Sequence, residues 1–282
     1  MNLNNFDDLP YNDQNILITE NDVNNILNGF DINIKCININ LYRKALVNKS
    51  YVTRKNENII SGNKNCPDNC LPLQEESNER FEFLGDSVLS TTVANYLYKR
   101  YPNQNEGFLT KMRSKLVNGQ MLSELCGHIK LNKWIIISKQ IEESGGRQNY
   151  KILEDIFEAF ICAIFMDFNS IKDNQLNIEN TIGLGFQIAE KWIINVIEDY
   201  VDFAELIKQN NNYKDKLIKY YQHTYFKAPK FYENNIEIIN NKKLFTIVIK
   251  DNNNKILGIG KSDTKKKAEQ VASENVLNEL NI

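Results

Sequence analysis

Three acidic side chains at helical spacing in residues 78–89 (Asn-Glu-Arg-Phe-Glu-Phe-Leu-Gly-Asp-Ser-Val-Leu) constrain this chain more than any other feature. At about 100° per residue, Glu79, Glu82 and Asp86 lie within about 60° of one another on a helix. Carboxylates stacked in this way repel each other unless a cation lies among them. Mg²⁺ suits such a face because it prefers oxygen ligands and keeps positions for water and phosphate. The alternative is a solvated acidic face, the usual arrangement of charges on a surface helix.

A second acidic pair favours the metal site. Asp155 and Glu158 are three residues apart, so they point the same way from a helix. The surrounding segment, residues 153–167, is too apolar for a surface helix. An ionised carboxylate pair in such a helix is costly unless it is paired or bound to metal. The two acidic faces therefore indicate one metal site shared by two largely buried helices.

Both segments resemble the signature of the ribonuclease III family. That signature pairs a Glu-Arg-x-Glu-Phe-Leu-Gly-Asp-Ser-x-Leu helix with an Asp-x-x-Glu-Ala helix about seventy residues on. Residues 41–50 are similar to the family's first helix and its Ala-Leu-Thr-His-x-Ser turn, with Asn48 where His is usual. Residues 105–118 are similar to its Glu-Gly-x-Leu-(Ser/Thr)-x-x-Arg-x-x-Leu-Val segment. The resemblance implies an all-α endonuclease domain that hydrolyses double-stranded RNA.

The resemblance also implies the site residues. Mg²⁺, with Mn²⁺ as an alternative, is expected to be bound by four carboxylates: Glu82, Asp86, Asp155 and Glu158. Glu79 and Glu106 match further family carboxylates near the cleavage site, in supporting or substrate-facing roles. All six are catalytic candidates. Arg113 and Lys151 are candidates for contact with the RNA backbone, and intradomain salt bridges are an equally weighted alternative.

From residue 213 the pattern changes. Residues 213–224 are helical, and an amphipathic helix is expected over residues 265–280. Between them lie three strand-like segments, at residues 230–239, 243–251 and 255–261. This α-β-β-β-α order, with Gly-x-Gly-x-Ser-x-Thr-Lys-Lys-Lys-Ala-Glu from residue 258, resembles a double-stranded RNA-binding domain of the α+β class.

The charge of the two parts fits this division. Residues 213–282 carry 13 lysines against eight acidic residues, a formal charge of +5, whereas the remainder has 21 basic and 28 acidic residues, or −7. Lysines in the first turn of a helix oppose its dipole, but a phosphate bound there reverses the effect. A solvated lysine run is the alternative. The RNA-binding candidates of this domain are Gln222, Lys265, Lys266 and Lys267.

Two departures from the RNA-binding pattern predict weaker binding. Lys219 stands where the family usually has a Glu that reaches into the minor groove. Positions 238–241 (Ile-Ile-Asn-Asn) lack the Gly and His of the usual Gly-Pro-x-His loop. Recognition of duplex shape through phosphates and 2′-hydroxyls should survive both changes.

The domain boundaries follow from the changes of pattern along the chain, and the resemblance implies what each domain is. We expect an N-terminal extension (1–33), a catalytic domain (34–206), a linker (207–212) and an RNA-binding domain (213–282), with a long polar loop at residues 54–77. Five scattered cysteines are typical of a reducing compartment. Cys66 and Cys70 could form half of a zinc site, but free thiols are the default. A polar, acidic start and the lack of a long apolar run predict a soluble, cytoplasmic protein with no membrane segment.

One catalytic domain contains one carboxylate cluster, whereas a duplex has two strands. The resemblance therefore implies a homodimer. Phe83, apolar between acidic neighbours, looks like the family's interface aromatic, with a core position in its own subunit as the alternative. The expected products carry a 5′-phosphate, a 3′-hydroxyl and short 3′ overhangs. The rival function is that of a non-catalytic protein that binds or sequesters double-stranded RNA.

Overall fold

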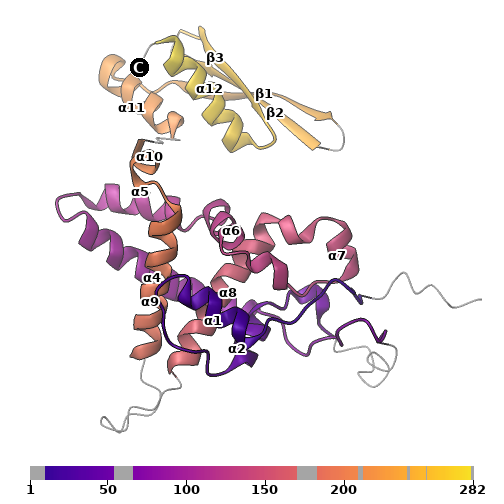
Figure 1. The fold of residues 1–282 in the computed structure, drawn as a ribbon. Coiled ribbons are helices and arrows are strands. Elements are labelled where there is room, and N and C mark those ends of the chain that lie inside the picture. Colours follow the sequence, from indigo (N-terminus) through magenta and orange to yellow (C-terminus); the bar gives the residue numbers. More distant parts are fainter. Residues whose placement is uncertain are drawn as a thin grey trace, which may run out of the picture. The chain divides into compact units, whose positions relative to one another are not determined.

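The structure, a computed structural model, describes residues 10–53, 66–169, 183–208, 212–239, 242–251 and 253–280 (Figure 1). The chain divides into two compact units, Met1–Leu206 and Ile207–Ile282. In the described residues the first unit is helical, and the second combines helices with a three-stranded sheet. The predicted fold class is confirmed. Residues 54–65 of the predicted 54–77 loop lie outside the described residues.

The first unit is built from helices of different length. In the described residues, short 3₁₀ helices connect them: η2 (Lys49–Tyr51), η4 (Leu131–Trp134) and η5 (Gly146–Gln148). The described α-helices are α1 (Glu20–Asn28), α2 (Ile39–Ala45), α4 (Glu79–Arg100), α5 (Glu106–Leu116), α6 (Gly119–His128), α7 (Lys139–Glu143), α8 (Tyr150–Asn169), α9 (Leu184–Tyr200) and α10 (Phe203–Lys208), which crosses the unit boundary.

Helix α8 is the centre of this unit. It is apolar around nearly its whole circumference, and helices α2, α4, α6 and α9 pack against it. Phe157 and Phe160 of α8 lie against Trp192 of α9, with ring centroids 5.8 and 5.6 Å apart. A helix enclosed in this way has little solvent for a charged side chain, so an acidic residue on it needs a partner.

Gly85 sets the distance between α4 and α8. A Cβ atom placed there would lie 1.8 Å from the backbone oxygen of Glu158. Real contacts are never that short, so glycine is required at this crossing. The close approach brings the acidic face of α4 against the acidic face of α8.

The N-terminal segment packs against this unit. Ile18, Val23 and Leu27 are buried in its core, together with side chains from α2, α4 and α8. The side-chain amides of Asn12 and Asn15 donate to the carbonyl oxygen of Ile137, at 3.2 and 2.9 Å. The boundary at residue 33 stays a prediction, but the segment before it contributes to the core.

Arg147 holds this segment in place. Its Nε lies 2.7 Å from Glu142 Oε2, and its Nη2 donates to Asn15 Oδ1 at 3.1 Å. Its Nη1 donates to the carbonyl oxygens of Asn132 and Ile135, at 3.1 and 2.8 Å. One guanidinium thus links the N-terminal segment to the residues before α7 and after it.

Replacing Arg147 by Met should lower the free energy of unfolding by about 3 kcal/mol, because Glu142, whose side chain is only 13% exposed, would be left without its cation. Urea unfolding followed by circular dichroism measures the loss. Arg113→Met, at an exposed position on α5, is the control and should cost less than about 0.5 kcal/mol. Equal stability of the two variants would show that Arg147 does not hold the segment.

The second unit has helices on one face of an antiparallel sheet. Its elements are α11 (Tyr213–Tyr225), β1 (Lys230–Ile239), β2 (Lys242–Lys250), β3 (Ile256–Ser262) and α12 (Lys265–Glu279), with strand order β1-β2-β3. A Cβ atom at Gly260 would lie 2.3 Å from the backbone of Ala268 and Ala272, so α12 rests directly on β3. The predicted helices and strands are confirmed. In the described residues, no helix combines the length and apolarity needed to cross a bilayer.

Candidate metal centre

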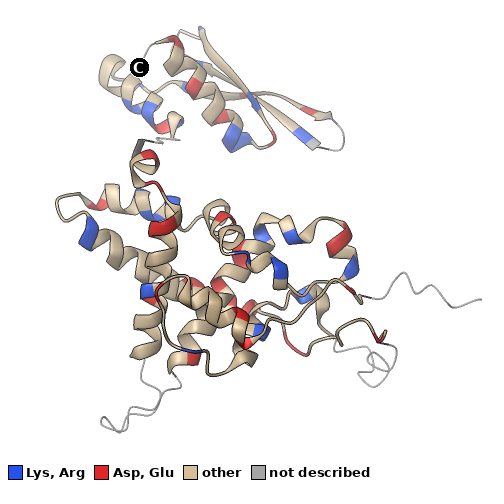
Figure 2. Ribbon diagram, in the orientation of Figure 1, with Lys and Arg blue, Asp and Glu red and all other residues tan. Residues whose placement is uncertain are grey.

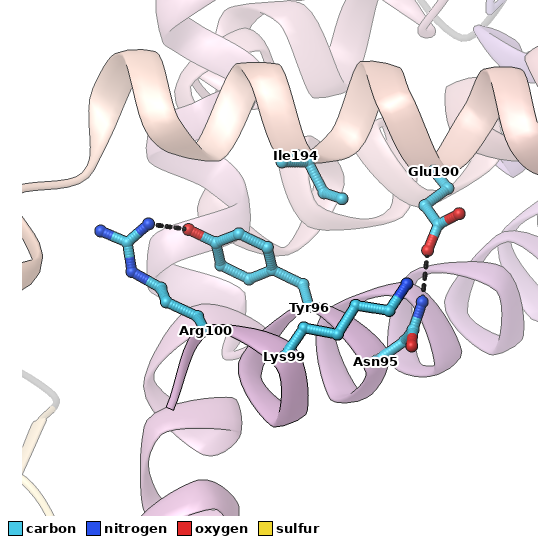
Figure 3. A pocket seen from close by; sticks show the side chains of 6 residues that line it. All are labelled: Asn95, Tyr96, Lys99, Arg100, Glu190 and Ile194. Carbon is cyan, nitrogen blue, oxygen red and sulfur yellow. Dashed lines mark hydrogen bonds between the residues drawn. The ribbon is translucent and has the colours of Figure 1, made fainter. Parts of the chain in front are cut away.

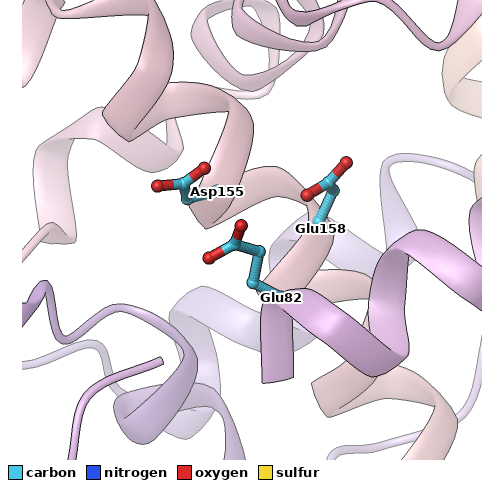
Figure 4. A group of neighbouring side chains, drawn as sticks. All are labelled: Glu82, Asp155 and Glu158. Carbon is cyan, nitrogen blue, oxygen red and sulfur yellow. The ribbon is translucent and has the colours of Figure 1, made fainter. Parts of the chain in front are cut away.

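Three of the predicted carboxylates meet between α4 and α8. Glu82 comes from α4, and Asp155 and Glu158 come from α8 (Figure 4). Each offers one carboxylate oxygen, and these oxygens lie within 4.8 Å of one another. Spacing of three residues places both α8 side chains on one face. The crossing at Gly85 brings Glu82 opposite them.

The cluster is short of positive charge. Glu158 is only 7% exposed. Burial raises the pKa of Glu158 to about 8, and the carboxylates of Asp86, Glu154 and Glu82 add to the rise. Burial also raises the pKa of Glu82, and the nearby Asp155 carboxylate raises it further. Burial likewise raises the pKa of Asp155, whereas the Lys151 ammonium lowers it. Without a metal ion, the protonated form of Glu158 is therefore favoured near neutral pH.

The donor set fits a hard divalent cation. Asp155 Oδ1 is buried, and Lys151 Nζ lies 3.0 Å from it. Glu82 and Glu158 add only carboxylate oxygens. Mg²⁺ and Mn²⁺ prefer such ligands, whereas zinc favours nitrogen and sulfur. The residues therefore fit the predicted Mg²⁺ or Mn²⁺.

The other predicted carboxylates lie outside this group of three. Asp86 accepts a hydrogen bond from Ser90 Oγ at 3.4 Å, and its charge acts on Glu158. Glu79 is 3.5 Å from Lys49 Nζ. Glu106 begins α5 and accepts from Thr110 Oγ1 at 2.7 Å. The structure thus gathers half of the predicted set, with Asp86 near it.

The predicted cationic and aromatic residues have distinct surroundings. Lys151 Nζ lies 3.1 Å from Glu154 and 3.0 Å from Asp155, so the salt-bridge alternative describes it in this structure. Arg113 is exposed on α5. Phe83 is 78% exposed, so the alternative that it is a core residue of its own subunit is wrong.

Sequence reasoning missed one buried acid. Asp167 of α8 is fully buried and accepts hydrogen bonds from the backbone N–H of Ile37 (3.1 Å) and Asn38 (2.8 Å) and from the Tyr42 hydroxyl (3.0 Å). It joins the chain before α2 to the end of α8. The sequence feature that could have identified Asp167 is an acidic residue within an apolar helix. Glu158 shares this feature.

Two further features are separate from the carboxylates. Cys66 and Cys70 are half-buried, neither forms a disulfide, and burial raises the pKa of each thiol. A groove of about 310 Å³ lies between α4 and α9 (Figure 3). A hydrogen bond from Asn95 of α4 to Glu190 of α9 crosses it at 2.6 Å, and on the α4 side Arg100 donates to the Tyr96 hydroxyl at 2.8 Å. None of the predicted site residues lines it.

The second unit presents lysines at the start of α12, which Figure 2 shows in blue. Lys266 is exposed, Lys265 Nζ lies 3.3 Å from Glu233, and Lys267 Nζ lies 3.1 Å from Asp263. On α11, Gln222 is exposed. The atypical Lys219 forms an ion pair with Asp215 at 2.8 Å.

Comparisons with known proteins agree with these observations. A family model described as Ribonuclease-III-like matches residues 38–180, and one described as Double-stranded RNA binding motif matches residues 213–280. A probable ribonuclease 3 of Acanthamoeba polyphaga mimivirus is 30% identical over 94% of this chain, which spans 46% of that protein's length. Ribonuclease 3 of Chlorobium luteolum is 30% identical, and the match covers 87% of this chain and 78% of that protein. The solved nuclease domain of ribonuclease III from Campylobacter jejuni is 27% identical, covering 63% of this chain and 96% of its own, with a TM-score of 0.46.

Proposed function

The chain belongs to the ribonuclease III family, and from this premise we propose that it is an endoribonuclease that hydrolyses double-stranded RNA with bound Mg²⁺. One observation carries the proposal: Glu82, Asp155 and Glu158 converge within 4.8 Å between two packed helices. We further propose catalysis with two metal ions. The products would carry a 5′-phosphate, a 3′-hydroxyl and short 3′ overhangs.

The carboxylates in and around this cluster would have different roles. Glu82, Asp155 and Glu158 would hold the cation, and Asp86 lies close enough to act on Glu158 electrostatically. Bound Mg²⁺ would supply an activated water and neutralise charge on the phosphoryl group. Glu158 must first give up the proton that burial favours. The enclosing α4 and α8 backbones hold the carboxylates in place, and Glu79 and Glu106 would support the site or face the RNA.

The rival proposal is a protein that binds duplex RNA without cutting it. All six predicted carboxylates are present, which favours catalysis. The test is to incubate the purified chain with long double-stranded RNA in Mg²⁺ and in EDTA. We expect short fragments in Mg²⁺ alone. Intact RNA in both, with a retained band shift, would support the rival.

The lysines that begin α12 should hold phosphates. Replacing Lys265, Lys266 and Lys267 together by Ala should weaken binding of duplex RNA of every sequence. The slope of log affinity against log salt concentration should also become less negative, by up to about 0.9 for each phosphate that the protein no longer neutralises. Gel-shift titrations at several salt concentrations measure the slope. The matched control replaces Lys214, whose ammonium pairs with Glu269 at 2.6 Å. An unchanged slope in the triple variant would place the phosphate-binding residues elsewhere.

We propose that the active form is a homodimer, because two clusters are needed to cut two strands. Phe83→Ala should weaken association by about 2–4 kcal/mol, as loss of a buried aromatic anchor does, and activity should fall with the dimer population. Sedimentation over a range of concentrations measures this. Tyr98→Ala, on the same helix and 72% exposed, is the control. A fully dimeric Phe83→Ala variant would remove Phe83 from the interface.

A further inference from the structure

Lys151 lies beside the carboxylate cluster, in the first turn of α8. Its Nζ is 3.0 Å from Asp155 Oδ1 and 3.1 Å from Glu154 Oε2. The lysine side chain is 58% exposed, whereas those of Asp155 and Glu154 are about one-fifth exposed. The ammonium therefore reaches from solvent onto a carboxylate of the proposed metal site.

This ion pair uses an oxygen that a metal would need. Within the described residues, Lys151 is the cation in ion-pair contact with Glu82, Asp155 or Glu158. Like charges that share one carboxylate oxygen in a partly buried site repel each other. An ammonium and a divalent ion therefore compete for Asp155.

Glu154 offers the ammonium a second partner. Its carboxylate lies at the start of α6, where a Cβ atom placed on Gly119 would be 2.6 Å from Glu154 Oε2. The positive end of the α6 dipole favours a carboxylate there. The Lys151 ammonium can thus leave Asp155 and still keep its ion pair with Glu154.

We propose that Lys151 is an exchangeable counter-ion: its ammonium holds Asp155 in the metal-free protein and leaves Asp155 when a divalent ion binds. This inference rests on the proposed metal site. In the metal-bound protein the ammonium stays near Glu154, at the mouth of the site. There it can face the backbone phosphate of an RNA strand.

Calorimetric titration of the chelator-treated full chain with Mg²⁺, without RNA, tests the exchange. Lys151→Gln removes the competitor, so it should bind Mg²⁺ about 3- to 10-fold more tightly than wild type. Lys151→Arg keeps the charge but can hold Asp155 through two N–H groups, so it should bind Mg²⁺ about 2- to 5-fold more weakly. Lys139→Gln, an exposed lysine of α7, is the control and should change the affinity less than about 2-fold.

Thermal unfolding gives an independent readout. Lys151→Gln should melt below wild type in EDTA, and this difference should become clearly smaller in saturating Mg²⁺, where only the ion pair with Glu154 is lost. An equal deficit in both conditions would assign Lys151 a merely structural role and overturn the exchange. An unchanged or weaker Mg²⁺ affinity of Lys151→Gln, or a wild-type affinity of Lys151→Arg, would also overturn it. If wild type itself shows no Mg²⁺ binding that Glu158→Gln removes, the proposed function fails instead.

Discussion

Glu158→Gln is expected to reduce cleavage of double-stranded RNA by about 10³-fold or more while RNA binding persists. The substitution keeps the shape of a side chain that is 7% exposed and removes a charge from the proposed metal site. Loss of several kcal/mol of transition-state stabilisation corresponds to an effect of this size. Cleavage is measured in Mg²⁺, and binding is measured in Ca²⁺, whose looser geometry should support binding without turnover.

Stability measurements separate this effect from unfolding. The folded-state pKa of Glu158, about 8, lies above the ordinary carboxyl value, so ionising Glu158 costs stability as pH rises from about 4.5 to 8. Gln carries no such cost. In EDTA at pH 8 the variant should therefore be at least as stable as wild type. Glu143→Gln, exposed on α7, should cleave normally. Cleavage by Glu158→Gln at a rate near that of wild type would contradict the assignment of Glu158.

Gly85→Ala should cost about 3 kcal/mol or more of unfolding free energy and weaken Mg²⁺ binding in whatever fraction folds. The new methyl group would lie 1.8 Å from the backbone oxygen and 2.6 Å from the carbonyl carbon of Glu158. Backbone atoms cannot rotate away as a side chain can, so α4 and α8 would have to separate. That separation would carry Glu82 away from Asp155 and Glu158.

Gly127→Ala supplies the matched control. Gly127 also lies in a helix, α6, but a Cβ atom there would meet nothing within 4 Å. Alanine is favoured over glycine in a helix by about 0.5–1 kcal/mol, so this variant should equal or exceed wild type in stability. Urea unfolding and Mg²⁺ titration of both variants make the comparison. If Gly85→Ala were as stable as Gly127→Ala and bound Mg²⁺ normally, the close crossing would not be what positions the site.

The helices and strands could be predicted from periodicity and from the family resemblance, but the partners of single residues could not. Glu158 and Asp167 both stand as acids in the same apolar helix. One lies in a carboxylate cluster, and the other accepts backbone N–H groups near α2. Spacing along one helix cannot distinguish these surroundings, because they depend on which other segments pack against it.

The N-terminal segment shows a second limit. Its Asn- and Asp-rich composition indicates an extension, yet Ile18 and Leu27 are buried and Asn15 bonds to the backbone of Ile137. From the sequence pattern, Arg147 could be placed only in a loop. Its partners could not be predicted, because they include backbone carbonyls and an Asn more than a hundred residues away. Interactions of this kind leave no periodic pattern in the sequence.

Anomalous scattering from Mn²⁺ in crystals of the full chain is the most direct test of the central claim, that these carboxylates hold the metal with which the protein cuts RNA. We predict a manganese peak bounded by Glu82, Asp155 and Glu158, with Asp86 beside it, and no such peak in crystals of Glu158→Gln grown in the same way. A protein that cleaves double-stranded RNA in Mn²⁺ yet shows no manganese at these carboxylates would contradict the account.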